Sequence, residues 1–150
     1  LNKRLRGVTS LCFVTRQKMH IKGFSFTRQQ RVLSRIDAAA CDRIYGDTFT
    51  IREKRVEGIG NNVTLDFGQL DFGEEGVTQI TICGRSLLEK NTIHLRFSGP
   101  DGDWGQIIEF LRAPYYEEQV FPLERISGKQ KLSFIFLPGS QFDFGWFRFT

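Results

Sequence analysis

The sequence predicts an all-β protein: an antiparallel β-sandwich of the jelly-roll type with an N-terminal β-hairpin extension. Three observations lead to this prediction. The 150 residues include 15 phenylalanines and one methionine, and phenylalanine favours strands and sandwich interiors. Fifteen glycines and four prolines fit many short strands joined by tight turns. From residue 48 to the end, apolar and polar residues alternate with the period of two that half-buried strands require.

Strand patterns recur along this part of the chain, and glycine, proline and asparagine mark the turns between them. Alternation is clearest around Leu95 and around Phe134, whose side chains we expect to point inward. Ala113-Pro114 is one of the turn signals. The expected strands are 48–53, 62–67, 77–83, 91–97, 106–111, 118–123, 131–137 and 144–149. Eight antiparallel strands with short connections suit a jelly roll.

The N-terminus repeats a pattern of the C-terminus. Residues 5–26 and 126–149 both carry L/I-x-G-x-x-x-L-x-F-V/I, a connector and a closing F-x-F. We therefore expect residues 1–26 to be the terminal hairpin of a preceding similar module and 27–40 to be a linker with one or two helical turns. Residues 41–150 would form the sandwich. The first residue is Leu rather than Met, which suggests a fragment of a longer polypeptide.

Charge is distributed unevenly along the chain. Residues 1–36 hold nine of the 21 basic residues and no acidic ones, which leaves 12 basic and 17 acidic residues elsewhere, a balance of −5. The basic segment suits either a nucleic-acid arm or a solvated hairpin edge, and its alternation with apolar residues favours the edge. We therefore expect no nucleic-acid partner. Without a signal peptide or an apolar run near 18 residues, we also expect no membrane partner.

The cysteines do not predict a disulfide framework or a zinc site. Cys12, Cys41 and Cys83 are odd in number and lack CxxC spacing. Cys12 and Cys83 stand within apolar strand patterns, which predicts that both are small buried hydrophobic residues. Free cysteines favour a cytoplasmic or anaerobic setting, although the sequence leaves the location unknown.

Three blocks of the sequence resemble family 6 carbohydrate-binding modules. They are LDFGQLDFGEEG at 65–76, IHLRFSGPDG at 93–102, and the stretch 128–149 that ends in WFRF. The family carries DFGEGG, I-x-x-R-x-D-G-P-x-G and a closing F-N-L-D-W-F-R-F in this order. Similar tails occur in bacterial family 2 glycoside hydrolases of the β-galactosidase type. The resemblance, over residues 41–149, implies a galactose-binding-like β-sandwich that binds carbohydrate as a non-catalytic module of such a hydrolase.

The resemblance also implies where sugar-stacking aromatic residues stand. The family binds sugar in loops at one end of the sandwich, where a flat ring packs on the apolar face of a pyranose. The corresponding loop, 112–117, offers Tyr115 or Tyr116. Trp104 is a second candidate platform or, alternatively, a cap on a hairpin. Trp146, among phenylalanines in the last strand, is expected in the core.

Polar candidates complete the expected sugar site. Asp143 stands at the family's asparagine, which hydrogen-bonds sugar hydroxyls. Asn61 and Asn62 stand where the family has its first aromatic partner. They would bind hydroxyls or simply form a turn.

Two further departures from the family concern Gly145 and calcium. Gly145 replaces the aspartate of the family's L-D-W-F. Of the acidic pair that binds structural calcium in the family, only Asp42 remains. A hard cation needs six or more oxygen ligands, which Asp42 alone cannot organise. We expect no required cofactor, and Asp42 is the one candidate metal ligand.

No catalytic constellation emerges from the acidic and histidine residues. Asp71, Glu74 and Glu75 cluster near one turn, whereas glycoside hydrolysis needs two carboxylates facing each other across a cleft. His20 and His94 lie in strand patterns without a nucleophile arrangement. Two functions stay open: a sugar-binding module, or a structural module that packs against the catalytic domain or a sister module.

Overall fold

The computed structural model describes residues 12, 14–18, 20 and 31–150. Residues 31–150 form an antiparallel β-sandwich, which confirms the predicted fold class. The strands are β1 (Ile36–Asp37), β2 (Arg43–Tyr45), β3 (Thr50–Ile51), β4 (Val56–Ile59), β5 (Val63–Asp71), β6 (Val77–Gly99), β7 (Gly102–Ile126), β8 (Lys129–Phe136) and β9 (Phe142–Phe149). Two short 3-10 helices, η1 (Arg31–Leu33) and η2 (Ala38–Ala40), flank β1. No helix in this part of the chain is long and apolar enough to cross a membrane.

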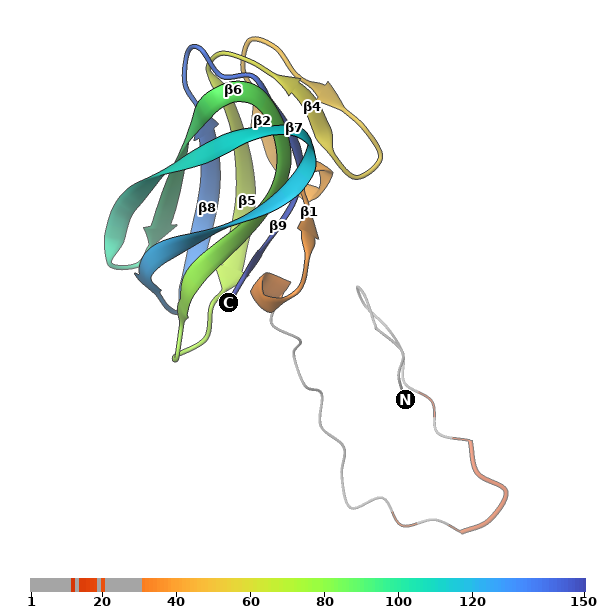
Figure 1. Ribbon diagram of the computed structural model, residues 1–150. Coiled ribbons are helices and arrows are strands. Elements are labelled where there is room, and N and C mark those ends of the chain that lie inside the picture. The colour runs from red at the N-terminus through yellow and green to blue at the C-terminus, as the bar shows by residue number, and fades with distance from the viewer. Residues whose placement is uncertain (1–11, 13, 19, 21–30) are drawn as a thin grey trace.

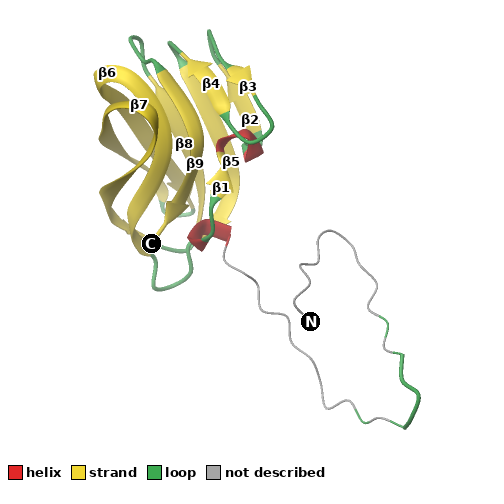
Figure 2. Ribbon diagram, turned by 45° about the vertical axis from the view of Figure 1, so that its right-hand side comes forward, coloured by secondary structure: helices red, strands yellow, loops and turns green. Residues whose placement is uncertain are grey.

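One hydrogen-bonded sheet folds over on itself to make the two layers (Figure 1 and Figure 2). The strand order is β2-β5-β8-β6-β9-β4-β3, with β7 along β6 and β1 along β9. Strand β6 belongs to both layers, because residues 93–98 pair with β8 and residues 80–85 pair with β9. Figure 1 shows β6 and β7 as two long bent ribbons that follow each other.

The long strands differ from the prediction of four separate strands. Segments 77–83 and 91–97 are both in β6, and 106–111 and 118–123 are both in β7. Pro114 therefore lies inside a strand. Proline is tolerated there because β7 is hydrogen-bonded to β6 alone among the described strands, and an edge strand has one unpaired side. Register shifts at 84–90 of β6 bend both strands without ending them.

Phenylalanine rings fill the space between the layers. Phe134 of β8 lies centrally, with ring centroids 5.7 Å from Phe67, 4.8 Å from Phe144 and 4.8 Å from Phe147. Most neighbouring rings meet edge to face, the arrangement that aromatic quadrupoles favour. The largest fully buried side chains include Phe67, Phe72, Phe97, Phe110, Phe134, Phe136, Phe142, Phe144, Phe147 and Phe149.

Residues 31–40 differ from the linker expected there. Val32 and Ala38 are fully buried, and Ile36 of β1 pairs with Phe147 of β9. These side chains belong to the sandwich because their apolar surface closes one side of its core. The hairpin expected within residues 1–26 falls largely on residues that the structure does not describe. Cys12 is exposed, contrary to its expected burial, and Cys83 is half-buried.

Candidate functional site

Three hollows lie next to one another on the side of the sandwich where β6 bends. The loop-end hollow, of about 340 Å³, is lined by residues that include Gly60, Ser86 and Gln141. A middle hollow shares Gly58, Arg85 and Asp143 with it. The third, which we call the arginine hollow, has a volume of about 430 Å³ and shares two arginines and a tyrosine with the middle one: Arg52, Arg55 and Tyr116. The shared residues make one continuous polar surface.

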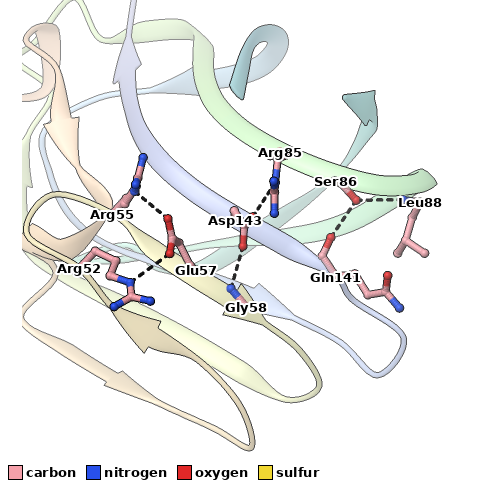
Figure 3. A network of polar contacts seen from close by, with 9 residues as sticks. All are labelled: Arg52, Arg55, Glu57, Gly58, Arg85, Ser86, Leu88, Gln141 and Asp143. Atoms are coloured by element: carbon pink, nitrogen blue, oxygen red, sulfur yellow. Dashed lines mark hydrogen bonds and ion pairs between the residues drawn. The ribbon is translucent and has the colours of Figure 1, made fainter. Parts of the chain in front are cut away.

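Asp143 joins three strands at the centre of this surface (Figure 3). One carboxylate oxygen accepts a hydrogen bond from the backbone N–H of Gly58 at 2.7 Å, and the other accepts one from Arg85 Nε at 2.7 Å. Gly58 has φ +62° and interrupts the pairing of β4 with β9, which frees its N–H for the side chain. The side chain of Asp143 is only 13% exposed, so it is a structural contact as well as part of the lining.

Glu57 holds two arginines of the β3–β4 turn (Figure 3). Arg52 Nε donates to one of its oxygens at 3.1 Å, and Arg55 Nε lies 2.7 Å from the other. The hydrogen bond from Arg52 and the charges of the nearby arginines hold the pKa of Glu57 below its ordinary value. Both guanidinium groups are thereby anchored beside the middle hollow.

The two tyrosines of β7 point in different directions, as successive residues of a strand must. Tyr115 is 77% exposed and lines none of the three hollows. Tyr116 is half-buried, and the Arg55 guanidinium lies 5.3 Å from its ring centroid. Burial, followed by the nearby carboxylates, raises the pKa of Tyr116 to about 12. Its hydroxyl is buried and has no hydrogen-bond partner in the described part of the chain.

Gly145 leaves room for the Tyr116 ring beside β9. A Cβ atom at Gly145 would stand 3.1 Å from the backbone oxygen of Cys83 and 3.4 Å from the Tyr116 ring. A longer side chain, such as the family's aspartate, would meet the ring. The departure at Gly145 and the position of Tyr116 are therefore one feature of the site.

Two polar residues that sequence reasoning missed fix the β8–β9 loop. Ser86 Oγ donates to the backbone oxygen of Gln141 at 2.8 Å and accepts from the N–H of Leu88 at 3.3 Å. Figure 3 shows these contacts at the bend of β6. The buried Asn91 accepts a hydrogen bond from the Gln141 N–H at 2.9 Å. In the sequence, Ser86 stands between the apolar strand patterns at 77–83 and 91–97, and Asn91 begins the second of them. Polar residues at such an interruption could have been predicted to fix a loop.

Asn61 and Asn62 hold turns together and do not line the three hollows. Asn61 Oδ1 accepts from the Gly139 N–H at 2.7 Å, which joins the β4–β5 turn to the β8–β9 loop. Asn62 has φ +53°, the left-handed conformation that asparagine tolerates, and its amide donates to Asp47 at 3.1 Å.

The two tryptophans lie at different places. Trp104 stacks on Phe97, with ring centroids 4.5 Å apart and planes 15° apart. It lines a separate hollow between β6, β7 and β8, which also contains His94. Trp146 is buried, 8% exposed, as expected, but it also borders the arginine hollow. The guanidinium of Arg35 lies 4.8 Å from its ring centroid.

The residues present do not fit a calcium ion at Asp42. Its carboxylate accepts a hydrogen bond from the backbone N–H of Gly68. The described residues contain no group of three or more His, Cys, Asp or Glu side chains that could hold a metal. Of the predicted site residues, the structure brings together Asp143 and Tyr116, and it places Tyr115, Asn61, Asn62 and Trp104 outside their shared hollow.

Comparisons with known proteins find similar structures but no similar sequences. No family model matches the sequence, and no curated protein matches it significantly. A family 6 carbohydrate-binding module from Clostridium stercorarium, solved with cellobiose, has a TM-score of 0.68 and 21% identity over 79% of this chain and 94% of that one. A β-1,3-glucan-binding family 6 module from Bacillus halodurans has a TM-score of 0.64 and 17% identity, covering 79% and 96% of the two chains.

A third similar structure is an enzyme. It is a glycoside hydrolase family 43 arabinoxylan arabinofuranohydrolase from Bacillus subtilis, solved with cellotetraose. Its TM-score is 0.65 and its identity 20%, over 85% of this chain but 29% of that chain. At such identities the likeness shows the fold alone. The chain has the β-sandwich fold of the family 6 carbohydrate-binding modules.

Proposed function

We propose that this chain is a non-catalytic carbohydrate-binding module that binds a polysaccharide or oligosaccharide weakly at the loop-end hollow. The observation that carries the proposal is the convergence of Arg85, Gln141 and Asp143 on that hollow. Solved proteins of the same fold were crystallised with cellobiose, xylose and cellotriose. Fixed donors and acceptors at one end of a rigid sandwich suit the hydroxyl groups of a sugar.

Few aromatic rings are available to stack on a sugar near this site. Tyr115 offers an exposed ring, whereas the ring of Tyr116 is covered on one face by Arg55. One stacking face and a few hydrogen bonds, offset by desolvation, support a Kd of about 0.1–1 mM. The module would belong to a bacterial glycoside hydrolase, a proposal supported by the likeness to part of the family 43 enzyme.

Titration calorimetry with cello-, xylo- and laminari-oligosaccharides and β-galactosides tests the proposal. Gln141→Ala should weaken binding, whereas Tyr115→Ala, at a ring outside the three hollows, should leave it unchanged. Asp143→Ala should weaken it too, but it also removes the contacts to Gly58 and Arg85. Asp143→Asn keeps one acceptor but sets an amide NH2 against the second donor, Gly58 N–H or Arg85 Nε. It should weaken binding less than Asp143→Ala does.

The alternative is a structural module that packs against the hydrolase catalytic domain. It is favoured by the arginines over Tyr116 and Trp146, because each guanidinium occupies a ring face that would otherwise stack on a sugar. Absence of binding heat at millimolar concentrations of every probe would reject sugar binding and leave this alternative. Binding that survives all of the substitutions would move the site to another surface.

A further inference from the structure

We propose that the arginine hollow receives the anionic group of an acidic sugar, which is the carboxylate of a uronic acid or a sulfate ester. The sugar would be one unit of a glycan that also occupies the neighbouring loop-end hollow. This inference rests on the proposed function and deepens it, because it names the chemical class of the glycan.

Positive charge is concentrated at this hollow. Its lining contains four basic side chains, Arg35, Arg52, Lys54 and Arg55, and one acidic side chain, Glu53. Arg35 is also paired with Asp37 at 3.2 Å, and Arg52 and Arg55 share Glu57, so Lys54 and the shared carboxylate leave the excess of positive charge. Residues 31–150 as a whole carry 14 basic and 17 acidic residues, so this concentration runs against the charge of the domain. Opposite charge in a partly enclosed hollow attracts an anion more strongly than it would on an open surface.

The arginines retain hydrogen-bonding capacity. Each guanidinium has five N–H donors, whereas an ionised carboxylate has about four acceptor positions. Arg52 and Arg55 share the single carboxylate of Glu57, so their ten donors exceed what that partner can accept. A carboxylate or sulfate group is the ligand whose oxygens match the planar fork of an arginine.

Aromatic rings hold the guanidinium groups in place. Arg55 lies over Tyr116, and Arg35 lies over Trp146, whose centroid is also 5.9 Å from Arg148. Arginines that are already ordered lose less conformational entropy when they bind a ligand.

These features favour an acidic glycan over a nucleic acid. Proteins that bind single-stranded nucleic acids stack the bases on open aromatic faces. Here, Arg55 covers a face of Tyr116, and Arg35 covers a face of Trp146. A nucleic acid also carries a phosphate at every nucleotide, and the surrounding domain, with 14 basic and 17 acidic residues over 31–150 and so a balance of −3, repels such a chain. A single anionic sugar needs only this hollow.

The test compares charged and neutral forms of one ligand on the full chain. Titration calorimetry would use tetragalacturonate, its neutral methyl ester, a sulfated oligosaccharide, cellotetraose and a DNA duplex, at about 0.05 M and about 0.5 M salt. We expect one anionic oligosaccharide to bind about tenfold more tightly than its neutral counterpart at low salt, with a smaller advantage at high salt.

Substitutions in the arginine hollow test whether this hollow causes the charged ligand's advantage. Arg52→Gln, Arg55→Gln and Lys54→Gln should each reduce the charged ligand's advantage, and Lys54 makes no ion pair in the described part of the chain. Arg125→Gln is the matched control, because it removes the same charge beside the β5–β6 turn, where Arg125 Nε donates to the Glu75 backbone oxygen. It should preserve the advantage.

The outcomes separate this inference from the proposed function. Cellotetraose binding without any advantage for carboxylate or sulfate would overturn the inference and leave the proposed function intact. No binding of any glycan would overturn both. An advantage that survives the three hollow variants, or DNA binding that those variants abolish, would also overturn the inference. Binding of acidic glycans alone, unaffected by Gln141→Ala, would support the arginine hollow and reject the loop-end site.

Discussion

At the scale of single residues, glycine allows aromatic rings to lie against the backbone of the long strands. Gly84 of β6 is buried, and a Cβ atom there would stand 2.2 Å from Cζ of Phe142. That ring is itself held against Phe110 and Phe136, with centroid distances of 4.9 and 5.4 Å. Phe142 therefore has little room to move.

Gly84→Ala should consequently destabilise the protein by about 1–3 kcal/mol, the usual cost of overpacking a core. Gly99→Ala in the same strand is the matched control, because the Cβ atom there would meet the end of the flexible Gln130 side chain. Urea unfolding measures both free energies. Equal losses in the two variants would show that Phe142 does not limit the space at Gly84.

At the scale of elements, two glutamines join the halves of β7. The Gln119 amide donates to the backbone oxygen of Leu111 and accepts from its N–H, both at 2.9 Å. Gln106 does the same between Pro122 and Glu124, at 2.7 and 3.2 Å. Each glutamine side chain thus makes the pair of backbone hydrogen bonds that a neighbouring strand would make. An exposed edge invites pairing with other chains, and these amides occupy it.

Gln119→Ala should lower stability by about 1–3 kcal/mol, because two hydrogen bonds are lost and the backbone groups of Leu111 return to water. Hydrogen exchange at the Leu111 amide should accelerate, and Gln106→Ala should have the same effect at Glu124. Gln69→Ala, at an exposed glutamine of β5, is the control and should change neither amide. Unchanged exchange at Leu111 in Gln119→Ala would contradict the bridging role.

The sequence predicted β3, β5, β8, β9 and both halves of β6 and of β7, but it missed the short strands β1, β2 and β4 and the bends that join the halves of β6 and of β7. Alternation identified the inward faces around Leu95 and Phe134, which are buried as expected. It failed at Pro114, because a proline between two apolar runs normally marks a turn, and only the pairing of β7 with β6 shows that the strand continues. Local patterns contain no information about that partner.

At the scale of the whole molecule, the sandwich assembles a surface that no single segment of the sequence reveals. Asp143 and Tyr116 were predicted from the resemblance, and they share the middle hollow. The arginine hollow combines Arg35, the β3–β4 turn and Trp146, which are distant in the sequence. Their charges look like ordinary solvated positions until the fold brings them together.

The extent of the domain leads to the last prediction. Val32 is fully buried and Ile36 is 4% exposed, whereas Leu33 between them is 52% exposed. If the sandwich begins at residue 31 rather than 41, Ile36→Ala should cost about 2–5 kcal/mol, and Val32→Ala should also be clearly destabilising. Leu33→Ala is the matched control and should stay within about 0.5 kcal/mol of the parent chain, as surface substitutions usually do. Thermal and urea unfolding of the three variants measure these differences.

Small, equal effects at all three positions would show that residues 31–40 are a linker. A large loss at Val32 and Ile36 alone would make this segment part of the folding unit, because its apolar side chains then supply core packing that residues 41–150 lack.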